Sequence, residues 1–145
     1  MNIRDILCAK DTKSSYSLFL QLERQAGEDP ALFQEYPLYL EMLKSNSSYL
    51  RVRGFRMLCA AAKWDTEGII RENLPQILAQ LQDEKPTAVR QCLGALPELI
   101  QGRPELTEQV FRKVSGLDLA GYKDSMQPLI RRDAEAFLKW VAEKK

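Results

Sequence analysis

Apolar residues recur at steps of three and four along almost the whole chain, and no stretch alternates with a period of two between turn residues. A repeat near 3.6 residues places apolar side chains on one face of a helix, so the sequence predicts an all-α fold. Short polar stretches rich in Ser, Asp, Pro and Gly interrupt the pattern and are typical of helix ends. They leave about seven expected helices of roughly ten to twenty residues, with the short connections of antiparallel hairpins.

Size and charge narrow the class of protein further. The chain of 145 residues is long enough for one domain with a sizeable core, and its formal net charge of +1 gives no overall attraction to nucleic acid or to an anionic membrane. Residues 1–10 contain too short an apolar run for a signal peptide, and no window resembles a membrane-spanning segment. We therefore expect a soluble cytoplasmic protein that does not contact a membrane.

A short motif recurs along the chain. A β-branched residue followed by arginine opens the second helix of three expected hairpins, and an Asn or Asp stands in the turn before it. The dipeptides are Val52-Arg53, Val89-Arg90 and Ile130-Arg131, and the turn residues are Asn46, Asp83 and Asp124. The second helices are expected to begin near Tyr49, Thr87 and Met126. Recurrence of this kind is typical of stacked helical repeats.

Residues 74–96, "LPQILAQLQDEKPTAVRQCLGAL", resemble a HEAT repeat of the armadillo-like helical family. Residues 36–60 follow the same pattern with one inserted residue, and the resemblance extends over residues 31–145. It implies a short HEAT-like α-solenoid of about three helical hairpins, at 30–65, 66–102 and 104–145, after an N-terminal cap at 1–27. It also implies a ladder in which Asp83 contacts Arg90 and Asp124 contacts Arg131.

The residue types that carry most enzyme chemistry are scarce. The chain contains no histidine, so the commonest general base and the usual zinc-binding patterns are missing. Its glycines form no phosphate-binding loop, and Gly54 and Gly94 are expected to permit close helix packing. The cysteines Cys8, Cys59 and Cys92 lie far apart, and we interpret them as structural residues. The sequence thus predicts no catalytic residue, no cofactor and no metal.

One enzymatic alternative follows from the resemblance. Some alkylpurine DNA glycosylases are built from HEAT-like repeats and use a Trp, an Asp and an Arg on the concave face. Trp64 and Asp65 invite this comparison, and Arg103 is a candidate for the arginine. Adjacent residues point about 100° apart on a helix, however, and Asp65 has the sequence context of an N-cap. A DNA-binding or glycosylase-like protein therefore remains the alternative function.

Basic residues concentrate in residues 47–64, which contain no acid. At helical spacing, Tyr49, Arg53, Arg56, Ala60 and Lys63 form one stripe. Such a stripe is either a solvated face with its share of the ladder or the concave surface that holds an acidic protein segment. Arg56 and Lys63 are the better candidates for function, because the HEAT-like register has no matching base at either place.

The expected function is a non-catalytic scaffold or adaptor that binds a protein or peptide with an acidic segment. Self-association through an uncapped end is a variant of this hypothesis, and Trp140 is expected in the core. The last helix offers a corresponding polar face, and Trp64 ends the basic helix beside a turn. The candidate partner-binding residues are Tyr49, Arg53, Arg56, Lys63, Trp64, Arg131, Arg132 and Lys139.

Overall fold

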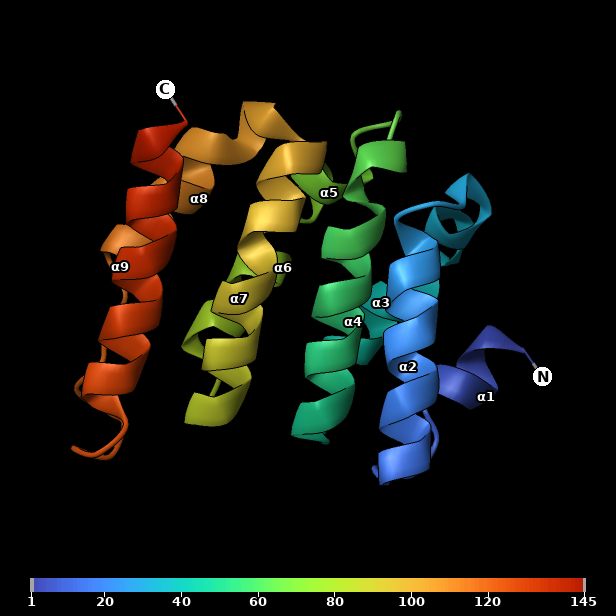
Figure 1. The fold of residues 1–145 in the computed structure, drawn as a ribbon, viewed down its shortest axis with the longest axis horizontal. Coiled ribbons are helices and arrows are strands. Elements are labelled where there is room, and N and C mark those ends of the chain that lie inside the picture. The colour runs from blue at the N-terminus through green and yellow to red at the C-terminus, as the bar shows by residue number, and fades with distance from the viewer. Residues whose placement is uncertain (1, 145) are drawn as a thin grey trace.

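The computed structural model describes residues 2–144, which form α-helices and short 3-10 helices and contain no strand. The all-α prediction is confirmed. Four long helices lie side by side in one row (Figure 1): α2 (Lys13–Ala26), α4 (Ser48–Ala61), α7 (Pro86–Gly102) and α9 (Gln127–Glu143). Within residues 2–144, no helix combines the length and the apolar character needed to cross a bilayer.

A second row, behind the first in Figure 1, consists of shorter pieces. Its α-helices are α1 (Ile3–Leu7), α3 (Tyr36–Met42), α5 (Ile69–Glu72), α6 (Leu74–Leu78) and α8 (Thr107–Ser115). Its 3-10 helices are η1 (Pro30–Glu35), η3 (Ala79–Gln82) and η4 (Pro104–Leu106), whereas η2 (Ala62–Trp64) directly continues α4 of the first row. Pro37 and Pro75 sit in the first turns of α3 and α6, where a missing N–H costs nothing, so each proline starts a new helix. The prediction of ten to twenty residues per helix is therefore wrong for this row.

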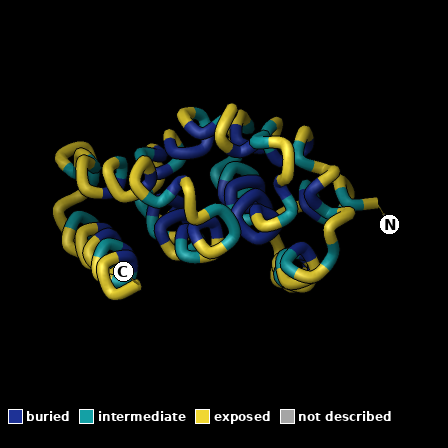
Figure 2. Tube along the Cα trace, turned by 90° about the horizontal axis from the view of Figure 1, so that it is seen from above, coloured by how far each residue is buried: buried dark blue, intermediate teal, exposed yellow. Residues whose placement is uncertain are grey.

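The long helices begin where the recurring motif places them. Helix α4 starts at Ser48, α7 at Pro86 and α9 at Gln127, each next to its expected position. Figure 2 shows the array from above: the two rows follow a shallow arc, with the long helices on its inner side. Helix α4 contacts α2, α3 and α7, and its second half is almost entirely buried.

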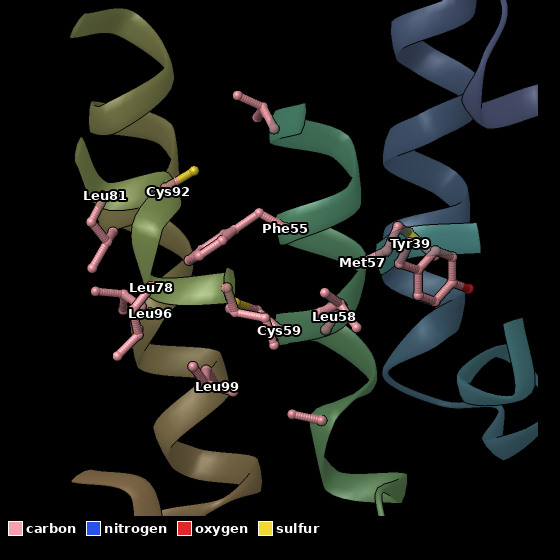
Figure 3. Close-up of a cluster of buried hydrophobic side chains, with 14 of the residues drawn as sticks. Tyr39, Phe55, Met57, Leu58, Cys59, Leu78, Leu81, Cys92, Leu96 and Leu99 are labelled. Atoms are coloured by element: carbon pink, nitrogen blue, oxygen red, sulfur yellow. The ribbon is translucent and has the colours of Figure 1, made fainter. Parts of the chain in front are cut away.

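The core lies between the rows and between neighbouring long helices (Figure 3). Phe55 and Cys59 of α4 face Leu96 and Leu99 of α7, and all four are at most 1% exposed. Each large apolar side chain buried in this way contributes about 1.5–3 kcal/mol to stability. The cysteines are free thiols, and burial raises the pKa of the Cys59 and Cys92 thiols. Both thiols are therefore held neutral within the core.

The two glycines expected at close contacts differ. A Cβ on Gly54 would lie 2.7 Å from the carbonyl oxygen of Tyr39 and 2.9 Å from the Cβ of Met42, so this glycine lets α4 approach α3. A Cβ on Gly94 would have no neighbour within 4 Å, and Gly94 is exposed. The packing prediction is confirmed for Gly54 and wrong for Gly94, which faces open space on α7.

The ion pairs of Arg51 and Arg90 connect segments that are far apart in the sequence. Arg51 donates from Nε and from its second terminal nitrogen to the carboxylate of Asp83, at 2.7 and 3.0 Å. Asp83 also accepts from the backbone N–H of Lys85 in its own turn, at 2.9 Å. Arg90 instead reaches forward to Asp133 of α9, with Nε 2.6 Å from the carboxylate.

The predicted pairs Asp83–Arg90 and Asp124–Arg131 are therefore wrong. Arg90 lies on the side of α7 that faces α9, while Asp83 is occupied by Arg51 from the preceding long helix. Asp124 and Arg131 are both exposed, and neither takes part in an ion pair within residues 2–144. The arginines of the recurring motif thus occupy equivalent positions in the sequence but make different contacts in the structure.

The two glycines offer a matched stability test. Gly54→Ala forces a Cβ against Tyr39 and Met42, and we expect a loss of about 1–3 kcal/mol in the free energy of unfolding. Gly94→Ala has room and improves helix propensity, so we expect a gain of up to about 1 kcal/mol. Urea unfolding followed by circular dichroism measures both. Equal effects of the two changes would contradict this packing.

A double-mutant cycle tests the bridge between hairpins. The side chains of Arg51 and Asp83 are only 12% and 4% exposed, so removing one partner leaves the other buried and unpaired. We expect Asp83→Ala to cost about 2–3 kcal/mol, and much less in an Arg51→Ala background. Asp83→Ala combined with Arg90→Ala is the control and should be additive. Coupling of Asp83 to Arg90 instead of Arg51 would refute the observed pairing.

Candidate functional site

The inner side of the arc carries one continuous depression, formed by three adjoining hollows that we call the concave groove. The α7–α9 hollow, of about 590 Å³, lies between those two helices. The α2–α7 hollow, of about 510 Å³, lies over α4, and the smaller α2–α4 hollow has about 260 Å³. Gln91 lines all three hollows, and Arg56 and Gly94 each line two. The groove therefore crosses all four long helices.

Arg56 lies at the centre of the groove but is not free to meet a ligand. Its guanidinium makes a two-pronged ion pair with Glu23 of α2, at 2.7 and 2.9 Å, and donates to Tyr16 and Gln91, each at 3.1 Å. Burial lowers the pKa of Arg56, but the hydrogen bonds to Glu23 and Tyr16 outweigh it, so the net shift is upward. Arg56 consequently ties α2 and α7 to α4.

Arg53 is a structural residue rather than a partner contact. It is 2% exposed, and its guanidinium donates to the carbonyl oxygen of Leu7 and the hydroxyl of Ser15, both at 3.0 Å. A weaker contact to Asp11, at 3.4 Å, completes its polar surroundings. Arg53 fastens the N-terminal segment to α4, and we remove it from the candidate binding surface because a ligand cannot reach it.

The other members of the basic stripe differ in exposure. Tyr49 is half-buried, and its hydroxyl donates to the carbonyl oxygen of Ala9 at 3.2 Å. Lys63 is exposed, and its ammonium lies 5.3 Å from the ring centre of Trp64. Trp64 is half-buried, with its indole N–H donating to the carbonyl oxygen of Ala26 at 2.9 Å. Of these three, only Lys63 presents a free polar group to solvent.

The three basic candidates of α9 do not line the groove. Arg131, Arg132 and Lys139 are exposed, and Lys139 lies 4.0 Å from Glu143 one turn later. The residues of α9 that line the α7–α9 hollow are Asp133, Ala136, Phe137 and Trp140. The structure thus separates the basic residues of α9 from the α4 stripe, although the sequence interpretation grouped them.

The three residues of the glycosylase comparison, Trp64, Asp65 and Arg103, lie together at one end of the array. There the Asp65 carboxylate binds backbone N–H groups of its own chain segment. Asp65 is 1% exposed and accepts from the backbone N–H groups of Glu67, Ile69 and Ile70, at 2.9–3.3 Å. Arg103 donates to the carbonyl oxygen of Asp65 at 2.6 Å and does not bond its carboxylate. The N-cap residue of α5 is Gly68, so the predicted N-cap position of Asp65 is wrong, but the Asp65 carboxylate still accepts from the first two N–H groups of α5, at Ile69 and Ile70.

The charges that line the groove balance one another. The bases are Arg24, Arg53, Arg56 and Arg90, and the acids are Asp11, Glu23, Glu98 and Asp133. Burial raises the pKa of Glu98, as does the neighbouring Glu23, while Lys63 and Arg56 act in the opposite direction. Within the α4 stripe, Arg56 is paired with Glu23 of α2, and Asp133 of α9 pairs with Arg90 of α7 instead.

Several groove residues escaped the sequence interpretation. Gln91, Gly94, Pro97 and Trp140 all line the α7–α9 hollow. One signal was available in the sequence. A face of α7 carries no large apolar side chain, and its four residues lie three or four positions apart and are all exposed: Thr87, Gln91, Gly94 and Glu98. Trp140, expected in the core, is half-buried and separates the α7–α9 hollow from a neighbouring one beside η4.

Comparison with protein-family models, with curated proteins and with solved structures found no significant match for this chain. The interpretation of the groove therefore depends on its geometry, burial and charge.

The pairing of Arg56 with Glu23 gives this arginine a role in stability. Arg56→Glu would place a carboxylate against Glu23 in a half-buried site, so we expect a loss of about 2–4 kcal/mol in the free energy of unfolding. Lys63→Glu, at an exposed position, should leave stability nearly unchanged. The exchange Arg56→Glu with Glu23→Arg should recover part of the loss. Urea unfolding of the four proteins measures this, and a neutral Arg56→Glu would show that the pair is unimportant.

Proposed function

We propose that this chain is a short HEAT-like α-solenoid that acts as a non-catalytic protein-interaction module, with the hairpins at 30–65, 66–102 and 104–145 and a cap at 1–27. Each proposed hairpin pairs a short, broken segment of the outer row with one long helix of the inner row. The Arg51–Asp83 and Arg90–Asp133 pairs join successive hairpins, and Arg53 joins the cap to the first. The HEAT-like sequence of residues 74–96 supports the same division.

The observation that carries the proposed binding function is the concave groove itself. It crosses α2, α4, α7 and α9, and its α7–α9 end is lined mainly by apolar side chains, including Phe137 and Trp140. The two larger hollows fall in the size range that holds ligands, and apolar surface with a few polar groups is the usual composition of such sites. A groove several helices long suits an extended protein segment better than a small molecule.

The charge of the groove narrows the choice of partner. The acidic segment expected from the sequence has weaker support, because Arg56 and Arg90 are paired within the chain. A nucleic-acid ligand has weaker support still, since phosphate binding requires a surplus of exposed bases and the groove carries as many acids as bases. For the glycosylase alternative, the committed carboxylate of Asp65 is the main obstacle.

Two further parts of the proposal concern the setting of the module. The outer side of α9 exposes Arg131, Arg132, Glu135 and Lys139, a polar surface that suits a solenoid end and disfavours self-association there. Free cysteines, two of them buried, suit a reducing compartment, and we propose a cytoplasmic location.

Photo-crosslinking tests the groove as the binding surface. A benzophenone amino acid at Gln91, exposed in the middle of the groove, should form crosslinks to discrete proteins in a native lysate. The same group at Gln109, exposed on α8 in the outer row, is the control and should not give these products. Nuclease treatment should leave the pattern unchanged. Crosslinks to nucleic acid alone, or release of alkylated bases from duplex DNA by the purified protein, would support the DNA alternative instead.

A further inference from the structure

We infer that the N-terminal segment, residues 2–11, occupies a peptide site on α4 of its own chain, and that a partner segment of the same chemistry binds there when residues 2–11 come away. That chemistry is one large apolar residue, two backbone carbonyl oxygens and a carboxylate four residues after the apolar one. This inference rests on the proposed function and specifies its ligand. Three features support it: the contacts of the segment, its limited burial and the cation that it covers.

The N-terminal segment contacts α4 through groups at every second residue. The carbonyl oxygen of Leu7 accepts from the Arg53 guanidinium at 3.0 Å, and that of Ala9 accepts from the Tyr49 hydroxyl at 3.2 Å. Asp11 then places its carboxylate 3.4 Å from the Arg53 guanidinium. A bound peptide is held in a similar way, by main-chain hydrogen bonds that give affinity and by alternate side chains that give specificity. The structure therefore shows what α4 recognises.

Little of the N-terminal segment is buried. Leu7 is fully buried, whereas Ile3 and Ile6 are only partly covered and Asp11 is exposed. Figure 1 shows α1 at the edge of the array, beside α2, and a helix of five residues is too short to be stable alone. Ordering residues 2–11 costs conformational entropy at each of them, and one fully buried side chain offsets little of that cost. Segments with so few buried contacts are those that open locally.

Opening of the N-terminal segment would uncover a cation that stays in place. Arg53 is 2% exposed while the segment is bound, and the segment supplies two of its three polar partners. The third partner is the Ser15 hydroxyl of α2. The Arg53 guanidinium also lies 5.4 and 5.0 Å from the ring centres of Phe19 and Tyr49. These contacts remain when the segment leaves, and the charge of Arg53 then becomes open to a ligand.

The covered cation selects a carboxylate. Asp11 is a weak partner, because its contact of 3.4 Å is longer than the about 2.7–2.9 Å of a good charge-assisted hydrogen bond and its side chain is 58% exposed. Both oxygens of Glu23 meet the charge of Arg56, whereas Arg53 has no such close ion pair. A partner carboxylate that approaches Arg53 more closely can replace Asp11. Asp11, Arg53 and Arg56 also line the α2–α4 hollow, so a segment bound here continues into the concave groove.

Competition between the chain's own segment and a free peptide tests this site. The probe is a fluorescent peptide of residues 2–12 carrying Cys8→Ser, titrated into the full chain and followed by fluorescence anisotropy. The unaltered chain should bind it weakly, because its own segment is present at a high effective concentration. Leu7→Ala in the chain removes the buried anchor, so we expect binding at least tenfold tighter. Asp11→Asn in the peptide should weaken binding about three- to tenfold. A segment with a purely structural role would give no tighter binding.

A matched pair of exposed acids provides the control. Asp11→Asn in the chain should tighten binding about threefold, whereas Asp5→Asn, at an exposed acid without an ion pair within residues 2–144, should not. Circular dichroism checks the fold, and this pair decides the matter if Leu7→Ala unfolds. Equal affinities of the unaltered and altered chains would overturn the inference, as would dimers of the unaltered chain that exchange segments. Crosslinks at Gln91 that persist would then leave the proposed function standing.

Discussion

Helix α4 contacts α2, α3 and α7 at once, and the remaining structure is arranged around its burial. Its apolar residues face α3 and α7, and Gly54 allows the close approach to α3. Its inner side would leave two guanidinium groups in a largely buried setting, which is costly unless each is paired. Helix α2 supplies Glu23 for Arg56 and the Ser15 hydroxyl for Arg53, and Leu7 of α1 supplies its carbonyl oxygen for Arg53. The N-terminal segment is therefore fixed by polar contacts as well as by apolar packing.

The same pairing shapes the concave groove. Arg56 and Arg90 form ion pairs with acids of neighbouring helices and are not free to bind a ligand. The groove therefore has balanced charge and a partly apolar lining. Function in such a surface depends on what packing leaves open, namely Gln91, Gly94 and Trp140 on α7 and α9. Gly94 and Pro97 both weaken an isolated helix, and Gly94 makes no packing contact that would offset this cost. Residues that lower stability and make no packing contact are the best candidates for a binding role.

Much of the fold could be predicted because it depends on short-range patterns. The apolar period identified helices, and the recurring Val-Arg or Ile-Arg motif placed the starts of α4, α7 and α9. The broken outer row was missed because the apolar period continues across the points where Pro37 and Pro75 start new helices, so it does not show those breaks. Of the concave groove, the sequence identified only the stripe on α4, and the members of that stripe differ in burial in a way that the spacing along one helix cannot reveal.

The sequence by itself determined which residues share a helix face, because helical geometry relates residues three and four apart whatever surrounds them. Only the tertiary structure decided which faces meet. It paired Asp83 with Arg51 rather than Arg90, buried Arg53, and left Trp140 half-open between two hollows. These outcomes depend on the distance between helices that are far apart in the chain, and a side chain several ångströms long can satisfy its charge in more than one direction. The packing of the helices determines which partner each charged side chain reaches, and it therefore determines both the stability of the array and the surface it presents.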